Sequence, residues 1–287
     1  MSRFQMRRQR LREILAGQRC VYPASVFDPI SARLAEASGF ECGMLAGSVA
    51  SFAVLGAPDL ILLTLTEFAA QAQRITRASE LPLLCDADHG YGNALNAMRT
   101  VEELECAGVA GFSLEDTDLP QAYGTNGAPS LLTPDAGEAK LRAALEARRD
   151  PGLVLAGRTS APAISGLAYT IVRLRRYQAT GVDAIFLVGV KSRDELDAIA
   201  GEARLPLILG GAGSALFDLD YLSSRGVRIC LQGHQPFQAA VAALAATYQA
   251  LRQGTAPQQL AGIASDELMR QVTRAADYTR WSRDYLD

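Results

Sequence analysis

Short apolar runs alternate along the chain with longer stretches in which apolar residues recur at helical spacing. Runs of this length, bounded by turn residues, are typical of buried strands. We expect eight strands: Val21–Val26, Gly43–Ala46, Leu83–Cys85, Gly111–Glu115, Leu153–Gly157, Ala184–Val188, Leu207–Leu209 and Arg228–Leu231. Eight strands that alternate with helices predict an α/β fold, a (β/α)8 TIM-type barrel.

Local signals mark where the elements meet. A helical stretch ends at a glycine and a strand follows at once at Gly39, Gly108, Gly181 and Gly226. Glycine adopts the left-handed conformation of a helix C-cap at little cost. We expect helices to start after Thr66, after Thr133, which precedes a proline, and after Ser192, where Ser192 and Glu195 form a capping box.

The sequence also indicates how many domains the chain forms. No GxGxxG motif opens a helix after any strand, which disfavours an open, doubly wound sheet. No proline- or serine-rich linker divides the chain, so we expect a single barrel domain over residues 1–287. The stretch 255–287 looks helical and lies outside the repeat, as a C-terminal extension of the kind that often serves as an oligomer arm.

Composition narrows the functional classes. The chain has 287 residues, 49% of them hydrophobic, which is ample for a large core. A net charge of −3 gives no reason to expect nucleic acid or an anionic membrane as partner, and no apolar run reaches the length of a membrane span. Five scattered cysteines without a CxxC pair indicate a reduced, cytoplasmic protein.

The segment Asp86-Ala87-Asp88-His89-Gly90-Tyr91-Gly92 follows an expected strand directly. Burying a carboxylate is costly unless it is paired or binds a metal. Asp86 and Asp88 are two residues apart and face the same side if the extended geometry continues. Two such oxygen ligands suit Mg2+ or Mn2+. The alternative is an Asx turn, in which the aspartates only cap the loop backbone.

Other polar residues also follow strands, and in a barrel the carboxyl ends of the strands meet at one mouth. Asp86, Asp88 and Glu115 are candidate metal ligands, and Arg158 offers a guanidinium fork for a carboxylate. The candidates for substrate contacts are Ser48, the backbone amides near Gly47, and His234. The expected substrate is a small dianion such as a 2-oxo diacid, which the metal would chelate while stabilising an enolate.

Each candidate residue could instead have a purely structural role. Arg158 and Glu115 could form only a structural salt bridge, and Glu115 or Asp116 could cap the next loop. Ser48 could cap a turn and His234 could be a packed histidine. His89 is expected mainly to orient its loop.

The acidic segment resembles the D-x-D-x-G-Y-G signature of the isocitrate lyase/phosphoenolpyruvate mutase superfamily. The resemblance extends from about Tyr22 to His234. It includes Ser25-Val26-Phe27-Asp28-Pro29, Gly47-Ser48-Val49-Ala50, Leu114-Glu115-Asp116, the helical segment Lys140-Leu141-Arg142-Ala143-Ala144, and Arg158-Thr159. It implies a barrel with a C-terminal helix exchanged between subunits, Mg2+ dependence and a homotetramer built as a dimer of dimers.

Within the superfamily the chain is most similar to the oxaloacetate decarboxylase branch, through Tyr22, the loop Asp88–Ala94 and Gly233-His234. The loop from Leu119 to Gly127 lacks the cysteine of the isocitrate-type lyases and, despite Asn126, the basic cluster of phosphonate mutases. The resemblance therefore implies Mg2+-dependent decarboxylation of oxaloacetate or a close 2-oxo diacid, with Tyr22 among the substrate-binding residues and His234 as the proton donor.

The chain departs from that branch at two strand ends. Ser160-Ala161-Pro162 follows Arg158-Thr159 in place of Asn-Ala, and Gly210-Gly211-Ala212-Gly213 replaces a loop that contains tyrosine. We expect these changes to enlarge one wall of the pocket and to remove a hydroxyl. They leave open another C–C lyase or a P–C hydrolase or mutase of the superfamily, and a barrel that binds a small anion without turnover.

Overall fold

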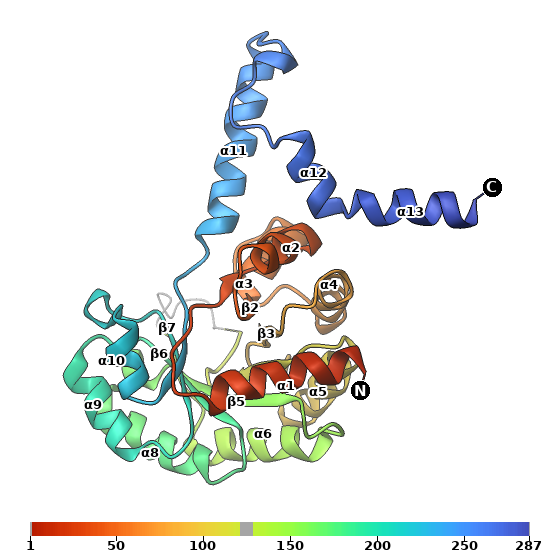
Figure 1. Cartoon of the computed structure of the whole chain (residues 1–287). Coiled ribbons are helices and arrows are strands. Elements are labelled where there is room, and N and C mark those ends of the chain that lie inside the picture. Colours follow the sequence, from red (N-terminus) through yellow and green to blue (C-terminus); the bar gives the residue numbers. More distant parts are fainter. Residues whose placement is uncertain (1, 121–128, 287) are drawn as a thin grey trace. The chain divides into compact units, whose positions relative to one another are not determined.

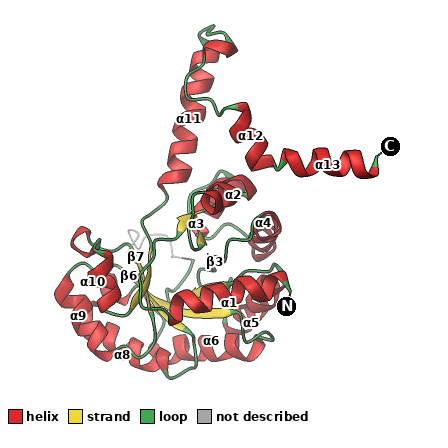
Figure 2. Ribbon diagram, viewed as in Figure 1, coloured by secondary structure: helices red, strands yellow, loops and turns green. Residues whose placement is uncertain are grey.

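A computed structural model describes residues 2–120 and 129–286. The chain divides into two compact units, Met1–Gly233 and His234–Asp287, which we describe separately. In the first unit eight parallel strands form one sheet in sequential order, surrounded by helices (Figures 1 and 2). They are β1 (Ala24–Ser25), β2 (Gly43–Leu45), β3 (Leu83–Asp86), β4 (Gly111–Glu115), β5 (Val154–Thr159), β6 (Ala184–Val188), β7 (Leu207–Gly210) and β8 (Val227–Cys230).

All eight predicted strands are confirmed, and β1 differs most from its prediction. It is shorter because Val21 does not pair with β2. Val21 instead forms a parallel bridge with Ile229 of β8. Two backbone hydrogen bonds make this seam, Val21 N–H to Arg228 O at 2.9 Å and Cys230 N–H to Val21 O at 3.0 Å. The seam joins the two edges of the curled sheet, which is the arrangement of a (β/α)8 barrel.

The helices of the first unit follow the strands in the predicted alternation. They are α1 (Arg3–Ala16), α2 (Pro29–Ala37), α3 (Gly47–Leu55), α4 (Leu65–Ala78), α5 (Ala94–Cys106), α6 (Pro134–Ala147), α7 (Ala161–Ile164), α8 (Gly166–Gln178), α9 (Arg193–Glu202), the 3-10 turn η1 (Ser214–Leu216) and α10 (Leu219–Ser224). Helix α1 precedes the first strand and lies beside β5 and β8.

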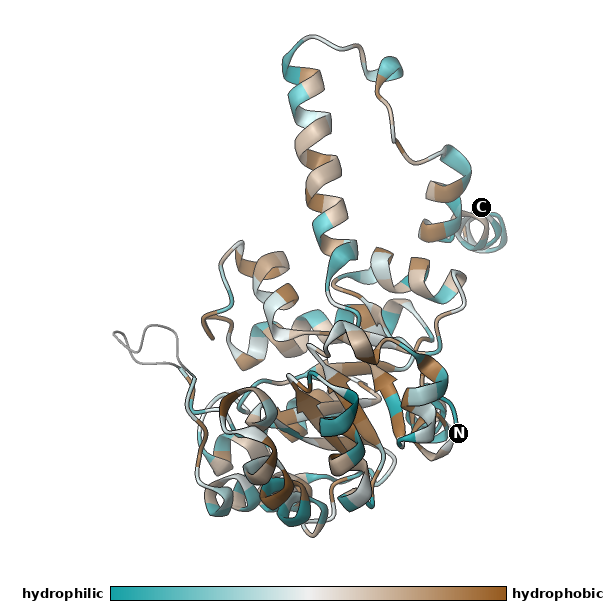
Figure 3. Ribbon diagram, turned by 90° about the vertical axis from the view of Figure 1, so that its left-hand side faces the viewer, coloured by the Kyte–Doolittle hydropathy of each residue, from teal (hydrophilic) through white to brown (hydrophobic). Residues whose placement is uncertain are grey.

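The core of the barrel has an inner and an outer layer, because successive side chains of a strand point to opposite faces. Inside, Leu84, Val154, Phe186 and Ile208 belong to one cluster of buried side chains. The outer cluster, between sheet and helices, takes the alternate positions, such as Cys85 and Leu155. Figure 3 shows the strands as the apolar centre of this unit.

The signals at the element ends are confirmed with one correction. The four predicted C-cap glycines all have positive φ, between 76° and 99°. Thr133 caps α6 and Ser192 caps α9, although Glu195 accepts from the backbone N–H of Lys191 and so leaves the capping box incomplete. The start predicted after Thr66 is wrong: α4 is capped by Thr64, whose capping box with Glu67 satisfies the first turn two residues earlier.

The second unit consists of α11 (Gln235–Arg252), the 3-10 turn η2 (Pro257–Gln259), α12 (Asp266–Thr273) and α13 (Ala275–Tyr285). It begins at His234, whereas the predicted extension begins at 255. Helix α11 has no buried residue, and Leu244 and Tyr248 are 53% and 66% exposed. In the described residues no helix is both long and apolar enough to cross a membrane.

Candidate active site

Strand alternation brings four polar side chains to the inner face of the barrel at the carboxyl ends of β3, β4 and β5. Asp86 pairs in register with Ser113, and Glu115 with Arg158. Ser113 Oγ donates a hydrogen bond of 2.9 Å to Asp86 Oδ1. Arg158 bonds Asp86 through Nη1 and lies 3.2 Å from Glu115 Oε2 through Nη2. These side chains are mostly buried, so the charges interact in a medium that screens them weakly.

Arg158 is held as a cation by its surroundings. Burial alone would lower its pKa, but the carboxylates of Asp86, Glu115 and Asp88 raise it. The guanidinium also lies over the ring of Phe186, 5.5 Å from the ring centroid. Its Nε is buried and has no hydrogen-bond partner within the described chain. Arg158 therefore keeps a spare donor at the site, which fits the prediction that it contacts a carboxylate.

Asp88 lies against the first turn of α3. A Cβ at Gly47 would be 2.6 Å from both carboxylate oxygens of Asp88, so only glycine fits there. Asp88 itself has φ +47°, a conformation that aspartate tolerates better than most residues. Burial raises the pKa of Asp88 well above its usual value, and the neighbouring charges of Asp86 and Glu115 raise it further. Burial raises the pKa of Glu115 too, against the opposing effect of Arg158.

The rest of the acidic loop is polar and buried. Burial and the nearby charge of Lys140 lower the pKa of His89 to about 4, so it is neutral at pH 7. Its Nδ1 and the hydroxyl of Tyr91 are buried without a hydrogen-bond partner among the residues described. Lys140 donates to the carbonyl of His89 at 2.8 Å. These contacts agree with a role for His89 in orienting the loop.

Gly47 and Ser48 are the first two residues of α3. The N-cap residue is Ala46, which gives no side-chain cap, so within the described residues the first backbone N–H groups of α3 are available to an anion. Ser48 is half-buried at this turn. The placement supports the prediction that this helix start receives a carboxylate, and the proximity of Gly47 to Asp88 joins it to the acidic loop.

Tyr22, another predicted site residue, does not face this cluster. Tyr22 packs in the outer layer, and its ring lies 6.3 Å from the ring of Phe217. Its neighbour Val21 belongs to the inner cluster, so strand alternation turns Tyr22 away from the barrel interior. His234 is the first residue of the second unit and the residue before α11, and its predicted role stays a prediction.

Asp116 follows Glu115 but faces the helices instead of the barrel interior. Its Oδ2 accepts from Arg173 Nη1 at 2.7 Å and from the Tyr177 hydroxyl at 2.6 Å. Gly137 makes room for Tyr177, because a Cβ there would lie 2.2 Å from the tyrosine oxygen. Adjacent acids thus have different roles: Glu115 belongs to the candidate site, whereas Asp116 ties β4 to α8.

The carboxylates fit a divalent cation by their chemistry. Among the described residues no three His, Cys, Asp or Glu side chains are grouped closely enough to form a ready-made metal site. The donors are nevertheless all carboxylate oxygens, as Mg2+ prefers. Asp88 and Glu115 also have raised pKa values, to which the charge of Asp86 contributes in both cases. A cation would relieve this repulsion, so the residues present fit the metal that the sequence predicts.

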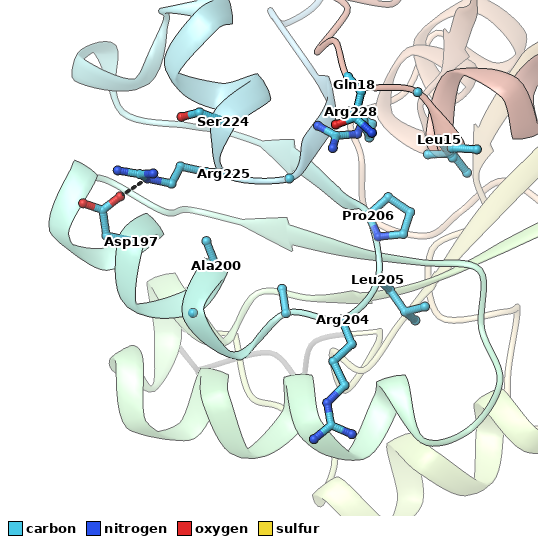
Figure 4. Close-up of a pocket in the computed structure, with 15 residues that line it drawn as sticks. Leu15, Gln18, Asp197, Ala200, Arg204, Leu205, Pro206, Ser224, Arg225 and Arg228 are labelled. Carbon is cyan, nitrogen blue, oxygen red and sulfur yellow. Dashed lines mark hydrogen bonds and ion pairs between the residues drawn. The ribbon is translucent and has the colours of Figure 1, made fainter.

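A large cavity of about 670 Å3 lies elsewhere, at the opposite ends of the strands. Its walls come from the end of α1, from α9 with the start of β7, and from the end of α10 with the start of β8. Figure 4 shows Arg225 directed at Asp197 and Arg228 beside Gln18, so these arginines do not converge on one point. We therefore place the candidate site at the carboxyl ends of the strands.

The glycine-rich end of β7 does not simply enlarge the pocket. A Cβ at Gly210 would lie 2.9 Å from the ring of Phe186, so this ring already occupies the space that a side chain would take. Gly213 lies against the carbonyl of Lys191, which a Cβ would approach to 2.2 Å. At the end of β5, Ser160 is followed directly by α7. The ring of Phe186 thus occupies the space beside Gly210, and the expected enlargement of this wall stays a prediction.

Several residues near the site were not singled out by the sequence. Ser113 and Phe186 could have been found from strand alternation, since both occupy inward positions beside predicted site residues. Asp59 raises the pKa of Asp88 from a loop that carries no motif, so no sequence signal distinguished it. The middle of the loop after β4, including Asn126, lies outside the described residues.

Comparisons with known proteins find relatives along nearly the whole chain. A family model described as phosphoenolpyruvate phosphomutase matches residues 11–252. The oxaloacetate decarboxylase of Rhodopseudomonas palustris is 57% identical over 268 residues, which cover 93% of this chain and 92% of that protein. The oxaloacetate decarboxylase of a Bradyrhizobium species is 54% identical over 284 residues, with 99% and 98% covered.

Solved structures show the same fold over nearly the whole chain. Oxaloacetate acetylhydrolase in complex with the inhibitor 3,3-difluorooxalacetate has a TM-score of 0.86 and 28% identity, covering 98% of this chain and 97% of that one. Phosphonopyruvate hydrolase in complex with oxalate and Mg2+ has a TM-score of 0.85 and 26% identity, covering 98% and 99%.

Proposed function

Because the chain belongs to the phosphoenolpyruvate phosphomutase family, we propose that it is a carboxy-lyase that converts oxaloacetate, or a close 2-oxo diacid, to pyruvate and CO2. The observation that carries this is the inward cluster of Asp86, Glu115 and Arg158 in a chain that is 53–57% identical to several oxaloacetate decarboxylases. With Asp88 beside them, the site has three acids and one arginine, which suits a small anionic substrate that arrives with a divalent cation.

Asp86 is proposed as the direct ligand of Mg2+, with Asp88 and Glu115 acting through water, because Mg2+ keeps several of its waters in protein sites. Mn2+ would suit the same oxygens. When bound, the cation would supply Lewis-acid polarisation of the 2-oxo group. Phosphonopyruvate hydrolase, a structural neighbour, binds Mg2+ together with oxalate, itself a small dicarboxylate.

The chain's own residues hold the substrate. Arg158 donates to one carboxylate through the guanidinium edge that includes the spare Nε. Ser48 and the free N–H groups at the start of α3 receive the second carboxylate at the positive end of the helix dipole. Together these contacts fix the orientation of the C–C bond that breaks, with the departing CO2 leaving its electron pair on the remaining carbon.

The proton that completes pyruvate is assigned to His234 on the basis of the sequence resemblance alone. A histidine titrates near neutral pH and can serve as a general acid. His234→Gln keeps a hydrogen-bond donor but cannot titrate. If this variant retains both the kcat and the pH profile of the wild type, another group supplies the proton.

The deciding experiment is to incubate the protein with oxaloacetate, with and without Mg2+, and to measure CO2 and pyruvate, subtracting the decarboxylation that Mg2+ catalyses by itself. We expect enzyme-dependent formation of pyruvate that EDTA abolishes. Acetate and oxalate as products would favour an acetylhydrolase activity instead, as in the structural neighbour of that name. Binding of oxaloacetate without any product would identify an anion-binding barrel.

The second unit supports an oligomeric enzyme. Apolar side chains on α11 are exposed, among them Val241, Leu244 and Tyr248 at 49%, 53% and 66%. Exposed apolar residues at this density on one helix are usually covered by another surface. We propose that the C-terminal helices are exchanged between subunits of a homotetramer, arranged as a dimer of dimers.

A further inference from the structure

Lysine is nearly absent from this protein. Among its 28 basic residues only two are lysines, Lys140 and Lys191, and the remaining positions are arginine. Lys191 is exposed in the loop after β6, whereas Lys140 on α6 is only 5% exposed. A buried position that keeps a lysine in such an arginine-rich chain suggests a need for a compact point charge with three freely oriented donors.

The ammonium group of Lys140 donates to two backbone carbonyls. It lies 2.8 Å from the carbonyl of His89, in the acidic loop, and 3.3 Å from the carbonyl of Glu115, at the end of β4. These two carbonyls belong to the segments that carry the candidate metal ligands. A single side chain from a helix therefore connects the backbone of both acidic segments from outside the site.

Two backbone hydrogen bonds also connect the described parts of these segments past the last register pair of β3 and β4. The N–H of Ala87 donates to the carbonyl of Ser113 at 3.1 Å, and the N–H of Glu115 donates to the carbonyl of Asp88 at 2.8 Å. The loop conformation is also unfavourable by itself, since Asp88 and Tyr91 have φ values of +47° and +60°. Non-glycine residues persist in that region only where surrounding contacts hold them.

We propose that Lys140 is a positioning residue that holds the acidic loop and the end of β4 in the spacing that metal binding requires. This inference rests on the proposed function only for its consequence in catalysis, because the effect on metal binding does not depend on the substrate. Lys140 does not touch the substrate. It holds the backbone of the segments that contain Asp88 and Glu115. Residues that hydrogen-bond to the groups around a metal have the same effect in other metal sites.

The test compares Lys140→Met with Arg142→Met on the same helix. Arg142 is exposed and pairs only with Glu138 among the described residues, so its loss removes a cation from α6 without touching the acidic segments. Binding of Mn2+ is measured by electron paramagnetic resonance without substrate, at a temperature where circular dichroism shows every variant folded. We expect the Kd for Mn2+ to rise about tenfold or more in Lys140→Met and to stay unchanged in Arg142→Met.

A second readout separates positioning from loss of stability. With oxaloacetate as substrate, the Lys140→Met variant should need more Mg2+ for half-maximal rate, and saturating Mg2+ should restore most of kcat. If Lys140→Met does not fold, Lys140→Gln is tested in its place. The glutamine amide can still donate hydrogen bonds, but it cannot serve the carbonyls of both His89 and Glu115 as the ammonium group does. Wild-type Mn2+ affinity in a folded Lys140 variant would overturn the inference.

The two proposals fail in different ways. A wild-type protein that makes no pyruvate but binds Mn2+ more tightly than the Lys140 variant would refute the decarboxylase and retain the positioning role. If the wild-type protein makes pyruvate and a folded Lys140 variant binds Mn2+ as tightly as the wild type, the decarboxylase is retained and the positioning role is refuted.

Discussion

At the scale of single residues, the site depends on which face of a strand each side chain takes. Glu115 and Asp116 are neighbours in sequence, yet Glu115 meets Arg158 inside the barrel and Asp116 meets Arg173 and Tyr177 outside it. Strand alternation explains why Asp86, Glu115 and Arg158, at or next to the ends of their strands, share the inward face. The outward position of Tyr22 could not be predicted, because a resemblance identifies a residue without giving the face on which it lies.

Replacing Arg158 by lysine tests the carboxylate contact at this scale. An ammonium cannot donate through several fixed N–H groups at once, and Arg158 here serves Asp86 and Glu115 while keeping Nε spare. We expect KM for oxaloacetate to rise at least tenfold, measured by steady-state kinetics at saturating Mg2+. Arg99→Lys, in an exposed pair on α5, serves as the control and should leave KM unchanged. An unaltered KM in Arg158→Lys would remove Arg158 from the substrate site.

Gly47→Ala tests the contact between α3 and the acidic loop. The new methyl group would overlap both carboxylate oxygens of Asp88, so the side chain of Asp88 must move. We expect the Mg2+ concentration for half-maximal rate to increase about tenfold, since positions around metal ligands have effects of this size. Gly201→Ala, in α9, is the matched control and should bind Mg2+ normally, because a Cβ there would meet no atom within 4 Å outside its own stretch of helix. Normal activation by Mg2+ in Gly47→Ala would mean that Asp88 does not contribute to the metal site.

At the scale of elements, helix α1 depends on contacts that its sequence pattern does not show. Arg8 is buried and bonds the carboxylate of Asp150 and the carbonyls of Glu105 and Val109. The repeat predicted the eight strands because continuous apolar runs are specific to a buried parallel sheet. The helix preceding β1 lies outside the repeat, and its attachment through buried arginines could not be predicted from periodicity.

Asp150→Asn tests how α1 is attached. Burial opposes ionisation of Asp150, but the hydrogen bonds from Arg8 and from the backbone N–H of Gly152, together with the charges of Arg8 and Arg12, outweigh it and lower the pKa. A lowered pKa stabilises the folded state above the unfolded pKa of about 4, and this stabilisation is lost as the pH falls further. We expect the substitution to cost about 1 kcal/mol at pH 7 and clearly less at pH 3, measured by urea unfolding. Glu102→Gln, in an exposed pair, should cost little at either pH. An equal cost at both pH values would exclude this ion pair as the cause.

At the scale of the whole molecule, the sequence predicted the barrel but placed the start of the helical extension at 255, whereas the second unit starts at His234. The pattern of α11 resembles that of the other helices, since it follows β8 as they follow their strands. Only its lack of buried residues distinguishes it, and burial is a property of the fold that composition does not reveal.

The oligomeric state is the test at this scale. The apolar residues exposed on the second unit should be covered in solution by other copies of the chain. We expect light scattering at micromolar concentration to give about four times the chain mass of 30.6 kDa. Two substitutions to aspartate on α11, Leu244→Asp and Tyr248→Asp, should lower that mass. A monomer mass for the wild-type chain would refute the assembly.

The seam between β8 and the segment before β1 has a consequence for how the barrel opens. One bridged residue pair, Val21 and Ile229, closes the ring there, whereas five pairs in register join β4 to β5. The ring should therefore open first at this joint, and brief openings expose backbone amides to solvent. In deuterated water, the amide protons of Val21 and Cys230 should be replaced well before those in β4 and β5. Local opening at the seam would then convert the closed barrel into an open sheet, while β3, β4 and β5, which carry the acidic site, stay paired.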